Sequence, residues 1–186
     1  MYFLPSDKTT FLPYSVAGWE DIKTFKYSID KKIKIIHAPT NREAKGSDFI
    51  LSALNKLQNR YKNLEVIVIE KLPYEKALKI YQEADIIIDQ VLIGWYGGFG
   101  VEVMKMGKPL CVFIREEDLK FIPKEMADDL KDSVININPY NIETELSKYI
   151  ENIGLLYKKS QASLDYVNKW HNPLYVASLT KQVYEI

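Results

Sequence analysis

Residues 64–90 read LEVIVIEKLPYEKALKIYQEADIIIDQ, which is a short apolar run, an amphipathic stretch and a second short apolar run. The two runs, Leu64–Glu70 and Asp85–Gln90, are nearly continuous in Leu, Ile and Val, as in parallel strands that are buried on both faces. Between them, apolar side chains recur at helical spacing over Tyr74–Ala84, and Pro73 suits the first turn of a helix. The stretch therefore predicts a strand, a helix and a second strand of one parallel sheet.

The same alternation continues on both sides of this unit. Three more strands are predicted, over Ile33–Pro39, Pro109–Ile114 and Ser133–Asn138. Helices are predicted over 47–61, 101–106, 124–130, 141–153, 155–170 and 173–186, with Asn141 as an N-cap. The order predicts the α/β class, as a Rossmann-like three-layer α/β/α sandwich with a mostly parallel sheet of about five to six strands. Such sheets bind ligands outside the carboxyl ends of their strands, so functional residues are expected there.

Residues 1–30 do not follow this alternation. They hold two prolines, Trp19 and several other aromatic residues, which is typical of a connector or hairpin that packs on another surface. The predicted organisation is a leader or interdomain linker over 1–30, followed by a Rossmann-like domain with C-terminal helices over 31–186.

The composition narrows the class of function. Lys and Arg together number 25, and Asp and Glu together also number 25, so the formal net charge is zero. Nucleic-acid binders usually have a basic excess. The single cysteine, Cys111, excludes a disulfide framework, and His37 and His171 lie too far apart for a local metal motif. The sequence shows no signal peptide and no apolar run near the roughly 20 residues of a membrane span, so the expected location is cytoplasmic.

The loop after the first strand reads TNREAKGS over residues 40–47. Gly46 allows a tight turn, and Ser47 can cap the next helix. A helix N-terminus beside Arg42 and Lys45 predicts an anion site, because backbone N–H groups and cations converge there. The alternative is a polar loop whose charges are simply solvated.

A second motif, GWYGGFGVE, follows the third strand over residues 94–102. Its glycines let a backbone approach a ligand closely, although it matches neither the dinucleotide nor the phosphate-loop fingerprint. Glu102 would lie one turn into the following helix, where a carboxylate can accept two sugar hydroxyls. The alternative is a flexible turn with a glutamate that complements the helix dipole.

Three other residues are weighed as candidates. Asp89 ends its strand, where it either faces the cleft or caps a loop. His37 is interpreted as a satisfied core histidine rather than a ligand, and Cys111 as a small buried hydrophobe.

Taken together, three segments resemble nucleotide-sugar glycosyltransferases of the GT-B fold, of the retaining, group 1 type. They are HAPTNREAKGSDFILSAL (37–54), YQEADIIIDQ (81–90) and GWYGGFGVEVMKMGKPL (94–110). The matching half of these enzymes is the C-terminal, donor-binding domain. The resemblance implies a hexosyltransferase that moves a sugar from a UDP-, GDP- or other nucleoside-diphosphate sugar to a glycan or lipid-linked acceptor, in polysaccharide or lipopolysaccharide synthesis. It implies no further cofactor and no metal.

The resemblance also implies roles for individual residues. The donor diphosphate would be bound by Arg42, Lys45, Gly97, Gly98, Phe99 and Gly100. Glu102 would hold the ribose, and the base would lie near Glu70, Lys71 and Leu72.

Two positions depart from the family pattern. The first glutamate of its Glu-x7-Glu segment falls on Gly94, so the contact to the transferred sugar is missing or comes from another residue, such as Asp89. The family's arginine stands five residues before the lysine, at Thr40 here, whereas Arg42 stands three before it. These departures concern sugar specificity more than donor binding.

Enzymes of this family have two Rossmann-like domains with the active site between them. The resemblance therefore implies an N-terminal domain, in cis or in trans, that holds part of the catalytic machinery, and it allows peripheral membrane association of the full enzyme. Three other functions stay open: a non-catalytic nucleotide- or phosphate-binding module, a sugar-nucleotide epimerase relative, and an interaction domain.

Overall fold

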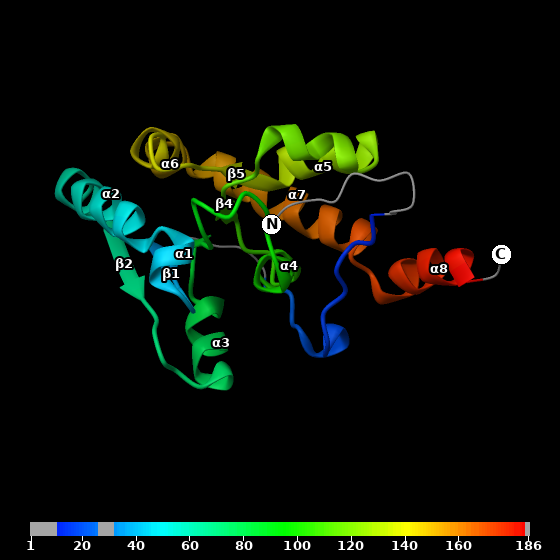
Figure 1. Cartoon of the computed structure of the whole chain (residues 1–186). Helices are drawn as coiled ribbons and strands as arrows, with labels where there is room; N and C mark the ends of the chain where they lie inside the picture. Colours follow the sequence, from blue (N-terminus) through cyan, green and yellow to red (C-terminus); the bar gives the residue numbers. More distant parts are fainter. Residues whose placement is uncertain (1–10, 26–31, 185–186) are drawn as a thin grey trace.

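The structure is a computed structural model that describes residues 11–25 and 32–184 (Figure 1). In this part of the chain, five parallel strands form one sheet in the order β2-β1-β3-β4-β5. They are β1 (Ile33–His37), β2 (Leu64–Val68), β3 (Ile86–Ile88), β4 (Leu110–Val112) and β5 (Val134–Asn136). Each lies within a predicted apolar run, and the predicted α/β class is confirmed.

The described helices are α1 (Arg42–Lys45), α2 (Ser47–Arg60), α3 (Tyr74–Gln82), α4 (Gly98–Lys105), α5 (Lys124–Ser133), α6 (Ile142–Glu151), α7 (Ile153–Trp170) and α8 (Pro173–Tyr184). Two 3-10 helices are also described: η1 (Trp19–Asp21) before β1, and η2 (Glu116–Phe121) between β4 and α5. The sequence patterns miss η1, η2 and α1, because such short elements show no apolar period.

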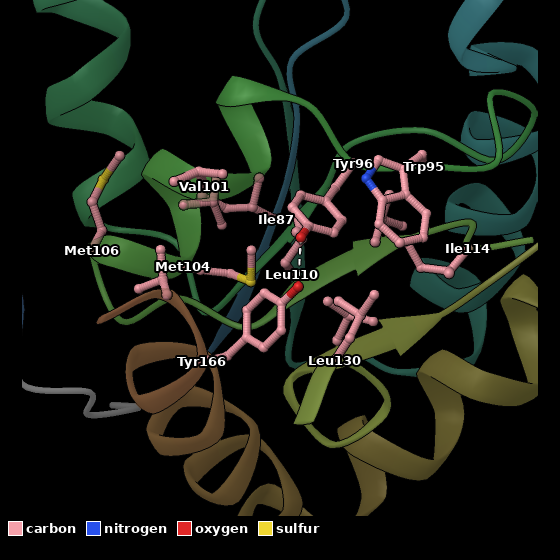
Figure 2. Packing of buried hydrophobic residues seen from close by; sticks show 14 of the residues in the cluster. Ile87, Trp95, Tyr96, Val101, Met104, Met106, Leu110, Ile114, Leu130 and Tyr166 are labelled. Atoms are coloured by element: carbon pink, nitrogen blue, oxygen red, sulfur yellow. Dashed lines mark hydrogen bonds between the residues drawn. The ribbon is translucent and has the colours of Figure 1, made fainter. Parts of the chain in front are cut away.

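Helices cover both faces of the sheet, as in a three-layer sandwich (Figure 1). On one face, Ile50 of α2 and Leu146 of α6 belong to the same apolar cluster as Ile86 and Ile88 of β3. On the other face, side chains of α3, α4, α5 and α7 form a cluster that includes Ile87. Figure 2 labels part of it, with Met104 of α4, Leu130 of α5 and Tyr166 of α7. Since side chains alternate along a strand, the three isoleucines of β3 serve both cores, which explains the continuously apolar strand sequences.

Two element boundaries differ from prediction and bear on the site. β1 ends at His37 rather than at Pro39, because proline has no N–H to donate to a neighbouring strand. α4 begins at Gly98 rather than at Val101, with Gly97 in the N-cap position. The last residues of the glycine-rich segment are therefore helical.

The prediction that the Asn141 side chain caps α6 is wrong. Asn141 stands at the N-cap position, but its side chain makes no capping hydrogen bond to the helix. Its Oδ1 instead accepts from the N–H of Asn138 at 2.6 Å, which closes the turn after β5.

Residues 11–25 pack against the domain. Trp19 is buried, and the ammonium group of Lys105 lies 4.3 Å from the centroid of its ring. The Phe25 N–H donates to the Met106 carbonyl at 3.1 Å. The rest of the predicted leader, 1–10 and 26–30, lies outside the described residues, so the domain boundary stays a prediction. Within the described ranges, no helix is both long and apolar enough to cross a membrane.

Candidate functional site

The predicted site residues lie on the loops that leave the carboxyl ends of β1, β2 and β3, and on α1 and α4. Because the strands are parallel, these loops share one edge of the sheet. The candidates fall into three groups there: the start of α4, a cavity beside β1 and β2, and a cluster of aromatic rings around Glu102.

The loop after β1 is shaped by one cap and one glycine. Asn41 caps α1, with its Oδ1 accepting from the Ala44 N–H at 2.9 Å. Gly46 then takes a left-handed conformation, with φ of 70°, between α1 and α2. A Cβ at Gly46 would lie 2.6 Å from Val91 Cγ2, so the loop can approach the segment after β3 only without a side chain here.

Ser47 does not cap α2, contrary to prediction. Gly46 occupies the N-cap position, and the Ser47 hydroxyl lies 2.8 Å from Nε2 of the buried His37. The other ring nitrogen of His37 lies 3.0 Å from the Ile88 carbonyl, which can only accept, so Nδ1 carries the proton and Nε2 accepts from Ser47. Burial lowers the pKa of His37. His37 is therefore a satisfied core histidine, as predicted.

Lys45 and Asp89 form an ion pair close to the start of α4. The Lys45 ammonium group donates to Oδ1 of Asp89, and only 12% and 5% of the two side chains are exposed. The same ammonium group lies 5.2 Å from the centroid of the Phe99 ring. The structure thus brings together one candidate from each of the loops after β1 and β3.

The start of α4 is open at Gly97. Gly97, at the N-cap position, has no atom within 4 Å of the place where a Cβ would lie. The first N–H groups of a helix have no partner within the helix and carry partial positive charge. Beside Lys45, the first turn of α4 is a place that can accept negative charge.

A cavity of about 640 Å³ lies between the ends of β1 and β2 and helix α3. Its lining includes four predicted candidates together with apolar and aromatic groups: Ala38, Pro39, Thr40, Arg42, Ile69, Glu70, Lys71, Leu72, Ala77 and Tyr81. Arg42 Nη1 lies 3.3 Å from Glu70 Oε2, so this arginine has a different carboxylate partner from Lys45. Lys71 has φ of 56°, a conformation that residues other than glycine seldom adopt, and such strain is concentrated at functional sites.

Two tyrosines of α3 face Glu102 and Phe99 of α4. The Tyr74 hydroxyl interacts with the Glu102 carboxylate, and the rings of Tyr81 and Phe99 meet edge to face with their centroids 5.4 Å apart. Burial raises the pKa of Glu102, while the Tyr74 hydroxyl opposes that shift. The sequence identified Tyr74 and Tyr81 only as one face of a helix. Their seven-residue spacing places the two rings on one face of the helix, but it does not show that this face packs on α4.

Gly94 lies beneath the guanidinium group of Arg115. Its φ is 88°, and a Cβ there would lie 2.9 Å from Arg115 Nη2. Two hydrogen bonds hold Arg115 in this place. Its backbone N–H donates to the Gly94 carbonyl at 2.9 Å, and its Nη1 donates to Asp118 Oδ2 at 2.9 Å. The room that a glutamate would need at position 94 is therefore taken by an arginine. The sequence did not identify Arg115 as a site residue, since only the fold places it beside Gly94.

Cys111 is buried in β4, and burial raises the pKa of its thiol, in line with its interpretation as a small hydrophobe. In the described part of the chain, no group of three or more His, Cys, Asp and Glu side chains could hold a metal ion. The expectation of a metal-free site stays a prediction.

No protein-family model matches the sequence, and no curated protein matches it. Solved structures do. The C-terminal domain of a glycosyl transferase group 1 family protein, LpcC, from Francisella tularensis is 18% identical, with a TM-score of 0.53 over 84% of this chain and 94% of that domain. The chain has the fold of a GT-B glycosyltransferase C-terminal domain.

Longer neighbours share this GT-B-type domain. TarM from S. aureus, in complex with fondaparinux, α-GlcNAc-glycerol and UDP, is 12% identical, with a TM-score of 0.66 over 89% of this chain and 38% of that one. A protein described as a UDP-N-acetylglucosamine 2-epimerase from Listeria monocytogenes is 13% identical, with a TM-score of 0.55 over 93% of this chain and 49% of that one. The chain thus spans half or less of these two neighbours, and the GT-B-type fold is common to a transferase and an epimerase.

Proposed function

We propose that this domain binds a nucleoside-diphosphate sugar and presents it for transfer, as the donor-binding half of a glycosyltransferase. The observation that carries the proposal is the meeting of Lys45 with the first turn of α4, next to Glu102 and the cavity. A nucleoside diphosphate needs a pocket for its base, an acceptor for its ribose hydroxyls and positive charge for its phosphates.

Each part of the site suits one part of this ligand. The cavity offers the Tyr81 ring and apolar side chains to a base, with Glu70, Lys71 and Leu72 on its lining. The Glu102 carboxylate can accept two ribose hydroxyls. Lys45 and the N–H groups of Gly98, Phe99 and Gly100 would hold the diphosphate, and Arg42, on the cavity lining, would add a second cation.

The same contacts would promote the reaction. During transfer, the bond between the sugar C1 and the diphosphate oxygen breaks, the acceptor hydroxyl oxygen bonds to C1, and its proton passes to a base. Negative charge develops on the departing diphosphate, where Lys45 and the α4 dipole can stabilise it. The structures of TarM and of S. aureus MnaA with UDP support a nucleotide ligand. We further propose a hexosyl donor, a glycan or lipid-linked acceptor, and a second domain that completes the active site.

Calorimetry with UDP, GDP and ADP tests this proposal and identifies the base. Lys45→Gln should weaken binding about 10-fold or more, because a hydrogen bond to a charged group contributes about 1.5–3 kcal/mol. The matched control is Lys56→Gln, which removes a cation that pairs with Glu143 across α2 and α6, and its affinity should not change. Equal affinities for the wild type and Lys45→Gln would overturn the proposal.

The second candidate is a sugar-nucleotide epimerase relative, which the likeness to the Listeria protein favours. An epimerase would invert the sugar C2 of a UDP-sugar without any acceptor. Proton NMR of the chain with UDP-N-acetylglucosamine separates the two, since a donor-binding domain would leave C2 unchanged.

A further inference from the structure

A buried chain of hydrogen bonds connects three distant segments of the sequence. The hydroxyl groups of Tyr96 and Tyr166 lie 2.5 Å apart, and Figure 2 shows this contact beneath the glycine-rich segment. The Tyr96 hydroxyl also lies 2.9 Å from His171 Nε2, and His171 Nδ1 lies 2.6 Å from the Tyr14 carbonyl. Tyr96, Tyr166 and His171 are each only 1% exposed.

The position of every proton in this hydrogen-bond chain follows from the Tyr14 carbonyl. The Tyr14 carbonyl can only accept, so His171 Nδ1 carries a proton and donates it. Burial lowers the pKa of His171 to about 4, so the ring is neutral at pH 7 and Nε2 accepts from the Tyr96 hydroxyl. The Tyr96 oxygen then accepts from Tyr166. Each donor has one acceptor, which fixes the rings in one arrangement.

Among these hydrogen-bonded residues, Tyr96 is the one that belongs to the candidate site. It lies between Gly94 and Gly97 in the glycine-rich segment, and its ring stacks on Trp95 at 5.2 Å. A Cβ at Gly100 would lie 3.0 Å from the Tyr96 Cβ, so the tyrosine lies directly against the first turn of α4. Fixing Tyr96 therefore fixes the backbone that begins α4.

Residues 11–25 hold the same segment from the other side. The Phe11 ring meets Trp95 edge to face at 6.4 Å. Val16 Cγ1 lies 3.8 Å from the place of a Cβ at Gly98, the first residue of α4. The Tyr14 carbonyl, between these two contacts along the chain, is the group that His171 binds. The ring of His171 thus joins residues 11–25 to the glycine-rich segment and to the end of α7.

We propose that His171 is a positioning residue for the nucleotide site. Its ring ties the Tyr14 carbonyl to the Tyr96 hydroxyl and so holds residues 94–100 in the conformation in which the first N–H groups of α4 face the diphosphate. The role in ligand binding rests on the proposed function. The positioning itself does not, because it concerns the backbone of the free protein.

The test uses the full chain and measures both the local order of residues 94–101 and the affinity for a nucleotide. Tyr96→Phe removes one hydroxyl and keeps the ring, and His171→Leu removes both ring nitrogens. The control, Ser160→Ala, removes a buried hydrogen bond of 2.7 Å from the Ser160 hydroxyl to the Gly107 carbonyl, which ties α7 to the turn that follows α4. Amide hydrogen exchange is followed over residues 94–101 without ligand, and affinity for UDP and GDP is measured by calorimetry.

We expect exchange over 94–101 to rise about 10-fold or more in Tyr96→Phe and His171→Leu and to stay unchanged in Ser160→Ala, with a matching loss of nucleotide affinity. His171→Gln offers both a donor and an acceptor and should recover part of both losses. If Tyr96→Phe and His171→Leu lose stability while exchange over 94–101 rises no more than elsewhere, His171 only stabilises the fold and the proposal is overturned. Should His171→Leu fail to fold, Tyr96→Phe decides the same question.

These outcomes separate the two proposals. If exchange changes as expected but the wild type binds neither UDP nor GDP, the positioning role holds and the proposed function fails. If the wild type binds a nucleotide and Tyr96→Phe binds it equally well with unchanged exchange, the proposed function holds and the positioning role fails.

Discussion

The Asp89 carboxylate is paired with the Lys45 ammonium group at the start of α4, in the place where the proposed ligand would bring its own negative charge. A buried carboxylate that already holds the cation competes with a phosphate for it. We therefore expect the pair to set the strength of anion binding as well as the position of Lys45.

Asp89→Asn should strengthen the binding of a nucleoside diphosphate. Asparagine can still accept a hydrogen bond from Lys45, while removal of a unit negative charge near the phosphates is worth on the order of 1 kcal/mol, or about 5-fold in affinity. Calorimetry with UDP and GDP measures this. Asp48→Asn, an exposed change in the first turn of α2, is the control and should leave affinity unchanged. Weaker binding of the sugar nucleotide alone would instead assign Asp89 to the sugar.

Glu102→Gln should weaken the binding of a ribonucleotide about 5- to 10-fold, since hydrogen bonds to a charged acceptor are stronger than those to an amide. The 2′,3′-dideoxy analogue lacks the hydroxyls that Glu102 would accept and should bind the variant and the wild type alike. Tyr74→Phe is expected to move affinity in the same direction, because the Tyr74 hydroxyl interacts with this carboxylate. An equal loss for both ligands would contradict a contact to the ribose.

Gly94→Ala should lower the free energy of unfolding by about 1–3 kcal/mol, because an L-residue is strained at φ of 88° and its Cβ would lie 2.9 Å from Arg115 Nη2. Gly97→Ala is the matched control. Its φ is −112° and the space around it is open, so its stability should stay within about 1 kcal/mol of the wild type. Urea unfolding compares the two, and similar losses would argue against the crowding at Gly94.

Stability should fall in mild acid because of His171. Its pKa lies at about 4 in the fold, against 6.5 for an unperturbed ring, so the unfolded chain takes up a proton first as the pH falls below 6.5. The stabilising contribution is present above pH 6.5 and lost as the pH falls toward 4, by about 3 kcal/mol for this shift. The buried His37 adds a loss of the same sign.

Urea unfolding of the wild type and His171→Gln at pH 7 and pH 4.5 checks this, because the glutamine does not titrate. The pH dependence of the variant should be clearly smaller than that of the wild type. Parallel losses in the two proteins would assign the acid sensitivity to other groups.

The strands could be predicted because burial on both faces leaves a direct pattern in the sequence. Ile86, Ile87 and Ile88 show it most simply, since each points into one of the two cores. Most of the helices followed from apolar spacing. α1, at four residues, could not, because nothing periodic distinguishes it from a polar loop.

The site was predicted only as far as it lies on single loops. Lys45, Glu102 and the glycines stand on segments with their own chemical character. Arg115 and Tyr74 act through partners far away in sequence, Gly94 and Glu102, and such pairs exist only once the sheet has brought the loops together. The hydroxyl of Ser47 shows the same limit, because its partner His37 is on another element.

The burial of Cys111 in the middle of β4 has a practical consequence. A thiol that is closed off from solvent, with a raised pKa, does not react with maleimides while the protein is folded. A second cysteine placed at an exposed position such as Tyr140 would then be the one group that takes up a dye or spin label, so the native sequence is already a background for site-directed spectroscopy.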